Sequence, residues 1–227
     1  MPRLSARFAR LMQVCRRRGR SQEEAEDLIQ EAFLRLHEYC RKTEVRDEEG
    51  FLTRTVSNLA INEYREFLSF YPTNDRADYA QFKLAMAHYY QMRKPERDQS
   101  ETREAISALQ TFVDRFPRSP LADEGRQRLR EAKDRLDDSD YRVGLFYFRA
   151  KWYPGAVDRL KALLDRDPQY TRRDAVYYYL AESYVAVKKE AEALPLYERL
   201  VKEFEQSEFL APSKKRIDEL KASLAKS

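Results

Sequence analysis

Residues 58–72, NLAINEYREFLSFYP, decide the fold because their spacing recurs along the chain. Ala60 is followed four residues later by Tyr64 and seven residues later by Phe67, and Pro72 stands five residues beyond Phe67. Apolar residues three and four apart share one face of a helix, and a Pro ends the helix before it. No Gly or internal Pro interrupts the stretch. It therefore predicts one helix that ends close to Pro72.

The full repeat begins with a small residue and an aromatic three positions on, followed by an Ala, two apolar residues and a Pro. Complete or partial copies are formed by Gly144, Tyr147, Ala156, Leu160, Leu163 and Pro168, by Ala181, Tyr184, Ala193, Tyr197 and Leu200, by Ala105, Leu109, Phe112 and Pro117, and by Ala85 and His88. Small residues let paired helices approach closely, and the Pro turns the chain into the next pair. The pattern predicts tetratricopeptide-like helix pairs, a helix at about 119–137 and a capping helix within 207–227.

Composition agrees with an all-α protein and excludes several other classes. Only 5 of the 227 residues are Gly, whereas 15 Tyr and 12 Phe argue against disorder. No apolar run approaches the roughly 20 residues that span a bilayer. Two Cys and two His show no metal-binding spacing, so we predict no metal and no cofactor. The first twenty residues carry seven Arg and no acid; they either touch a polyanion or form a solvated, frayed terminus.

The front of the chain predicts two helices. Ser21 and Glu24 have the spacing of a capping box, so a helix should start there, and a second should begin near Asp47. The apolar stripe of the first helix is formed by Ala25, Leu28, Ile29, Ala32, Phe33, Leu36 and Tyr39. Because Ala60 and Phe67 continue the phase of the second helix, we predict one continuous helix over residues 50–70.

The segments AEDLIQEAFLRLHEY and VRDEEGFLTRTVSNLAINEYR, within residues 21–66, together resemble region 2 of the extracytoplasmic-function branch of the sigma-70 family. In that family an additional helix precedes them, which here is short and rich in Arg. The resemblance implies that the first helix docks on core RNA polymerase through Asp27, Gln30, Glu31, Phe33 and Leu34. It implies that the second helix faces the promoter −10 element through Arg54, Asn58, Asn62, Tyr64 and Arg65. Nothing downstream resembles region 4, so loss of promoter activity is an equal alternative.

Residues 67–221 resemble the BamD family of outer-membrane assembly lipoproteins, most closely from Phe70 to Asp98 with the elements FYP, DYAQ, YYQM and ERDQ. The resemblance implies a periplasmic location and two kinds of partner, namely the periplasmic domains of the barrel insertase and unfolded outer-membrane proteins. Val14 before Cys15 and the Arg residues around it do not fit a lipoprotein signal, so the sequence as written predicts the cytoplasm. The predicted domains are 1–66 and 67–227.

Aromatic residues on the repeats are the candidate partner-binding groups, with intramolecular packing as the alternative role for each. They are Tyr79, Phe82, Tyr89, Tyr90, Trp152, Tyr177 and Tyr178. Three successive tyrosines, Tyr177 to Tyr179, cannot all face a core, so we expect at least one to be exposed. No catalytic constellation is present, and we interpret Asp137 and Asp138 as a turn or helix cap rather than as a general acid and base.

The sequence thus favours a non-enzymatic protein-interaction scaffold. A sigma-like transcription factor that binds core RNA polymerase and promoter DNA is the first alternative. An artificial or accidental fusion without integrated function is the second.

Overall fold

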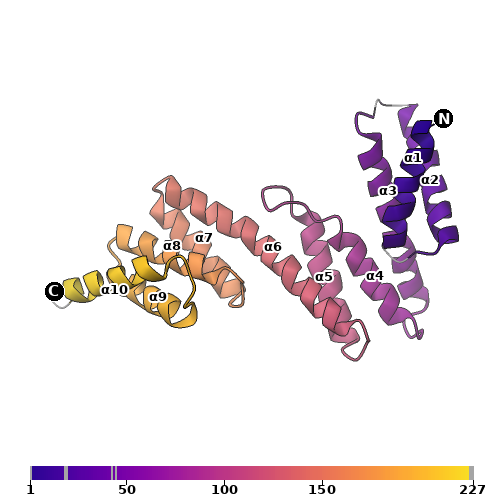
Figure 1. Ribbon diagram of the computed structural model, residues 1–227. Coiled ribbons are helices and arrows are strands. Elements are labelled where there is room, and N and C mark those ends of the chain that lie inside the picture. The colour runs from indigo at the N-terminus through magenta and orange to yellow at the C-terminus, as the bar shows by residue number, and fades with distance from the viewer. Residues whose placement is uncertain (1, 18–19, 42, 44, 225–227) are drawn as a thin grey trace. The chain divides into compact units, whose positions relative to one another are not determined.

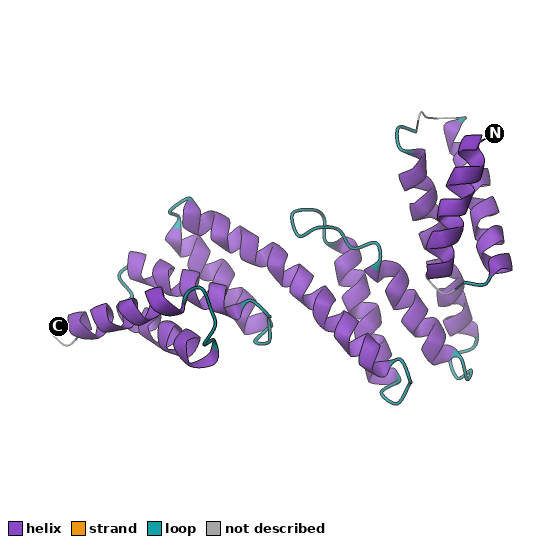
Figure 2. Ribbon diagram, in the orientation of Figure 1, coloured by secondary structure: helices purple, strands orange, loops and turns teal. Residues whose placement is uncertain are grey.

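The computed structural model describes residues 2–17, 20–41, 43 and 45–224, and within them it shows helices and no strand (Figures 1 and 2). The all-α prediction is confirmed. The helices are α1 (Pro2–Arg17), α2 (Gln22–Cys40), α3 (Glu48–Phe70), α4 (Ala77–Tyr89), α5 (Ser100–Arg115), α6 (Ala122–Arg149), α7 (Tyr153–Arg166), α8 (Arg173–Ala186), α9 (Glu190–Glu203) and α10 (Leu210–Leu224).

Contacts divide the chain into two compact units. Unit 1 comprises Met1–Arg93 and Asp98–Ala132, and unit 2 comprises Lys94–Arg97 and Lys133–Ser227. The boundary falls inside α6, so α1 to α5 belong to unit 1 and α7 to α10 to unit 2. The division into the domains 1–66 and 67–227, which follows the two family resemblances, stays a prediction.

The prediction of one continuous helix over residues 50–70 is confirmed by α3. Asp47 caps its start by accepting a hydrogen bond from the backbone N–H of Gly50 at 2.9 Å, and the helix ends two residues before Pro72. The first half of α3 packs in one core with α1 and α2, and its second half packs against α4. One helix therefore joins the front segment, which contains α1 and α2, to the first repeat, which begins with α4.

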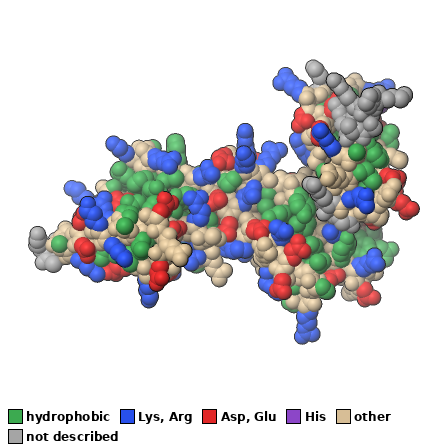
Figure 3. Space-filling model, viewed as in Figure 1, with side chains coloured by type: hydrophobic (Ala, Val, Ile, Leu, Met, Phe, Trp, Pro, Cys, Tyr) green, Lys and Arg blue, Asp and Glu red, His purple; other side chains and the backbone are tan. Residues whose placement is uncertain are grey.

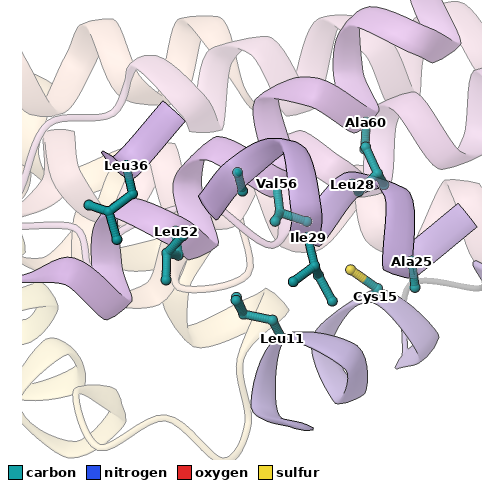
Figure 4. Close-up of a cluster of buried hydrophobic side chains, with 10 residues drawn as sticks. Leu11, Cys15, Ala25, Leu28, Ile29, Leu36, Leu52, Val56 and Ala60 are labelled. Atoms are coloured by element: carbon teal, nitrogen blue, oxygen red, sulfur yellow. The ribbon is translucent and has the colours of Figure 1, made fainter. Parts of the chain in front are cut away.

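The first core of unit 1 lies between α1, α2 and the first half of α3 (Figure 4). The predicted capping box is confirmed, since Ser21 and Glu24 exchange both hydrogen bonds at the start of α2. Leu11 and Cys15 of α1 are buried in this core beside Ile29. The expectation of a solvated, frayed terminus is therefore wrong for α1, because its apolar stripe packs against α2 and α3.

The repeat template is confirmed by burial and by helix ends. Its buried members are Ala60, Ala85, His88, Ala105, Leu109, Phe112, Gly144, Ala156, Leu160, Leu163, Ala181, Ala193, Tyr197 and Leu200. Helices α3, α5 and α7 each end two residues before the template Pro, and α9 ends two residues before Glu205, which stands in the place of Pro. Close helix approach at small residues and termination by Pro thus set the pairing of the helices.

Helix α6 differs from the prediction because it continues without a break from Ala122 to Arg149. Asp137 and Asp138 lie inside it and form neither a turn nor a cap. The buried carboxylate of Asp137 accepts a hydrogen bond from Arg166 at 2.6 Å, while Asp138 binds the hydroxyl of Tyr170. These distant partners stabilise an acidic pair that sequence alone assigns to a helix end.

The predicted capping helix is confirmed as α10. Leu220 is buried and Ile217 is half-buried against α8 and α9, whereas the side chain of Leu224 lies outside the described residues. Arg216 of α10 fixes this packing through hydrogen bonds of 2.7 and 2.8 Å to the carboxylate of Glu182.

The continuity of α3 is tested at Glu66, an exposed position within its second half. Glu66→Pro removes the backbone N–H that bonds the carbonyl of Asn62 and introduces a ring clash, so we expect the free energy of unfolding to fall by about 3 kcal/mol. Denaturant unfolding followed by circular dichroism measures this loss.

Glu66→Ala is the matched control, because it removes the same side chain and retains the N–H; it should change stability by less than about 0.5 kcal/mol. Equal stability of the Pro and Ala variants would contradict a helix that continues through this position.

Candidate protein-binding surfaces

Unit 2 contains a groove of about 540 Å³ formed by α7, α8 and α9. Three leucines, one from each helix, give it an apolar floor: Leu164, Leu180 and Leu196. Its other lining residues include two cations and two acids, namely Lys161, Arg199, Asp165 and Glu192. The template marks the buried face of each helix, but it gives no sign of this groove, which depends on how three helices meet. An apolar floor with mixed charges suits a polypeptide segment that is partly apolar.

The three tyrosines of α8 are not exposed, which corrects the sequence-based expectation. Tyr177 is buried. Tyr178 is half-buried, with its ring stacked on Phe209 at 4.7 Å between centroids, and Tyr179 packs edge-on against Phe148 at 5.0 Å. Neighbouring helices cover α8 on several faces, so all three rings take part in packing. Tyr177 and Tyr178 therefore act as structural residues, although Tyr177 also borders the groove.

Trp152 is exposed at the turn between α6 and α7, with 56% of its surface accessible. Its ring meets Tyr147 edge-on at 4.8 Å and lies over Gly155, where an added Cβ would come within 2.7 Å of the ring. Phe146 is also exposed nearby on α6. On the side of unit 2 that Figure 3 shows, hydrophobic side chains lie beside Lys and Arg. Trp152 is thus a fixed, accessible aromatic group.

The four aromatic candidates of unit 1 fall into two classes. Phe82 is buried with its ring 5.2 Å from that of Phe112, so it is a core residue rather than a partner-binding group. Tyr89 is half-buried and donates its hydroxyl hydrogen to Glu131, and burial together with that carboxylate raises the pKa of Tyr89. Tyr79 and Tyr90 are exposed but border two different grooves, so the structure does not bring them into one site.

Four of the five candidate polymerase-binding residues lie on the outer side of α2. Asp27 and Gln30 are exposed, and Leu34 has 63% of its surface accessible. Glu31 accepts a hydrogen bond from Arg35 at 2.8 Å, and Phe33 is half-buried against the first core. The exposed Leu34 therefore forms one surface with Asp27, Gln30 and Glu31. Phe33 instead packs on the inner side of α2, against the first core.

The candidate DNA-binding residues of α3 are divided between solvent and protein. Arg54, Asn58 and Asn62 are exposed. Tyr64 is half-buried beneath the guanidinium of Arg20, 4.4 Å from the ring centroid, and burial raises the pKa of Tyr64 to about 12. The fifth candidate, Arg65, points toward the repeat.

Arg65 lies 3.8 Å from Glu104 of α5 and 3.5 Å from Nε2 of His88. The other ring nitrogen of His88 is 2.9 Å from Glu101. This polar cluster between α3, α4 and α5 was not predicted, because the residues involved are far apart in sequence. Arg65, one of the candidate DNA-binding residues, therefore makes contacts within unit 1.

The part of the chain that the structure describes contains no group of three or more His, Cys, Asp or Glu residues that could hold a metal ion. None of its helices is both long enough and apolar enough to cross a membrane.

Comparison with known families gives two matches. The model of the YfiO family, described as outer membrane lipoprotein, matches residues 51–197, more than half of the chain. The chain belongs to this family. The model of sigma-70 region 2 matches residues 6–66, which extends the predicted resemblance to include most of α1. The two matches overlap over residues 51–66, entirely within α3.

Curated relatives of this YfiO-family chain are named outer membrane protein assembly factor BamD. The protein of Caulobacter vibrioides is 28% identical over 134 residues, which are 59% of this chain and 44% of the relative. That of Rickettsia prowazekii is 23% identical over 59% of this chain and 53% of its own length. That of Vibrio cholerae is 24% identical over 46% of this chain and 48% of its own length. The chain thus spans about half the length of these relatives.

The contrast between packing and accessible aromatic groups in this YfiO-family chain can be measured. Phe82→Ala should lower the free energy of unfolding by about 3–5 kcal/mol, because it leaves a cavity beside Phe112. Tyr90→Ala, in the same helix pair, should lower it by less than about 1 kcal/mol because Tyr90 is 49% exposed. Denaturant unfolding of both variants tests this, and similar losses at the two positions would contradict the assignment.

Proposed function

We propose that this chain is a non-catalytic scaffold that binds segments of partner proteins through its helical repeats. The observation that carries the proposal is the groove of unit 2, whose apolar floor comes from α7, α8 and α9. Membership in the YfiO family supports it, as does the name of the relatives, which are assembly factors for outer membrane proteins. The partners proposed are unfolded outer-membrane protein segments and the periplasmic domains of the barrel insertase, at the periplasmic face of the outer membrane.

The chemistry of the groove favours an extended segment with a few apolar side chains. Leu164, Leu180 and Leu196 offer apolar surface, and burial of such surface stabilises a complex by roughly 25 cal/mol per Å² before the entropy lost on binding is subtracted. Lys161 and Glu192 are exposed lining residues that contact polar groups of the same segment. Trp152 adds an exposed aromatic contact within unit 2, and Tyr79 and Tyr90 do so in unit 1.

Pro195→Glu tests the groove. Pro195 is exposed, lines the groove and lies inside α9, so Glu adds a negative charge at the site and restores a helical backbone N–H. We expect binding of fluorescently labelled unfolded outer-membrane protein to weaken about tenfold, which corresponds to about 1.4 kcal/mol. Fluorescence anisotropy on the purified chain measures the affinity.

Ala191→Glu provides the control, since it adds the same charge to an exposed position of α9 that does not line the groove. Its affinity should equal that of the unmodified chain. Equal weakening by both variants, or by neither, would exclude the groove as the binding site.

A second candidate function is binding of core RNA polymerase in the cytoplasm by the front segment. The specific observation in its favour is the outer side of α2, where Leu34 is exposed among Asp27, Gln30 and Glu31. An exposed Leu surrounded by polar groups is a fitting centre for a small protein interface. The match to sigma-70 region 2 supports the same assignment.

Leu34→Glu tests this candidate in a paired assay with core RNA polymerase on one surface and the insertase domains on another. Polymerase binding should weaken at least tenfold in Leu34→Glu, because the charge replaces the apolar centre of the interface, and insertase binding should stay unchanged. Gln22→Glu, another exposed position of α2, is the control and should retain both interactions. Binding to neither surface by the unmodified chain would contradict both proposals and favour a fusion without integrated function.

A further inference from the structure

A small cavity of about 20 Å³ lies in unit 1 where the front segment meets the first repeat. Apolar side chains from α2, α3 and α4 form most of its wall, including Leu28, Val56 and Met86. Two cationic side chains, Arg20 and Lys83, also line it, whereas no Asp or Glu does so among the described residues. The cavity is therefore lined by two cations and by mostly apolar side chains.

Arg20 is the more buried of the two cations, with only 9% of its side chain accessible. Its Nη1 lies 2.8 Å from Glu63, and its guanidinium lies over the ring of Tyr64. Its Nε and Nη2 have no hydrogen-bond partner in the described part of the chain. These two atoms form one edge of the guanidinium, where two N–H bonds point in parallel, which is the arrangement that binds anions. A buried edge of this kind is unfavourable without an acceptor.

Lys83 supplies the second charge. Its ammonium is half-buried and lies 5.1 Å from the ring centroid of Tyr79. Burial lowers the pKa of Lys83; the negative charge of Glu124 opposes this decrease, and the positive charge of Arg20 adds to it. Two cations thus face one cavity, and the carboxylate nearest to Arg20 binds the opposite side of its guanidinium. An anion between them would relieve their repulsion.

We propose that this cavity binds one small monovalent anion, with chloride as its simplest occupant, between the Nε–Nη2 edge of Arg20 and the ammonium of Lys83. The small volume suits a compact monatomic ion better than a larger anion such as phosphate or sulfate. A water molecule fits less well, because its two hydrogens need acceptors and the charged groups of the wall are donors. Arg20 and Tyr64 also line a larger groove of about 250 Å³, which gives the ion a route from solvent.

The site joins three parts of unit 1. Arg20 precedes α2, Tyr64 belongs to α3, and Lys83 belongs to α4 of the first repeat. A bound anion therefore links the front segment to the repeat at a place where like charges would otherwise repel. The site shares no residue with the groove of unit 2 or with the outer side of α2, so its test does not depend on either binding function.

The test compares thermal unfolding of the full chain in sodium chloride and in sodium gluconate at a matched ionic strength of about 0.15 M, since gluconate is too large for the cavity. We expect the Tm to be about 3 °C higher in chloride, because a ligand that binds only the folded state raises Tm. Lys83→Met keeps an unbranched side chain that is one atom shorter and removes the charge, so this difference should disappear. Arg103→Met, which removes an exposed cation of α5 outside the cavity, should retain it.

Crystals of the unmodified chain grown in sodium bromide provide a second measurement that needs no variant. An anomalous peak between Arg20 and Lys83 is the expected result. No peak there, or the same Tm in chloride and gluconate for the unmodified chain, would overturn the proposal, as would an undiminished difference in Lys83→Met.

Discussion

One helix, α3, takes part in two hydrophobic cores, and the rest of unit 1 depends on this constraint. Leu52, Val56 and Ala60 pack with α1 and α2, whereas Ile61 packs with α4, and Tyr64 contacts both clusters. Each residue turns a helix by about 100°, so one inserted residue between Ala60 and Ile61 would rotate one contact face away from its partner. The two sets of contacts therefore fix the register of α3 in relation to both the front segment and the repeat.

This shared register gives a physical account of the overlap between the two family matches at residues 51–66. The same residues fit both the sigma-like pattern and the repeat pattern. Ala60 is small enough for close helix approach, and Tyr64 fills the space where the two cores adjoin. The consequence for the surface is that Tyr64 is only partly accessible, whereas Arg65 contacts neighbouring helices and stays exposed. Tyr64 lies beneath Arg20, and Arg65 contacts Glu104 and the ring of His88, so both lie against other residues of unit 1.

The features that the sequence predicted correctly are those governed by nearby residues. Ser21 and Glu24 form a capping box within one turn, Asp47 caps α3, and each template Pro follows its helix end by two residues. Features that depend on distant partners were missed. The acidic pair inside α6 binds Arg166 and Tyr170, and the burial of Phe82 and Tyr177 depends on which neighbouring helices cover them. The groove of unit 2 could not be predicted from the sequence for the same reason, because residues of three helices form it.

The distribution of accessible groups favours protein contacts over nucleic-acid contacts in both parts of the molecule. In the front segment, the outer side of α2 keeps Leu34 and its acidic neighbours exposed, whereas Tyr64 and Arg65 of α3 are engaged within unit 1. A single strand of DNA is held by aromatic stacking and by cations along its backbone, and these two residues are the aromatic group and one of the two cations among the five candidates. The exposed Arg54, Asn58 and Asn62 leave hydrogen bonding without the stacking partner. Unit 2 offers an apolar groove with balanced charge, which lacks the excess of cations that phosphate binding requires. Protein binding is therefore the class of function that we propose for the surfaces of both units.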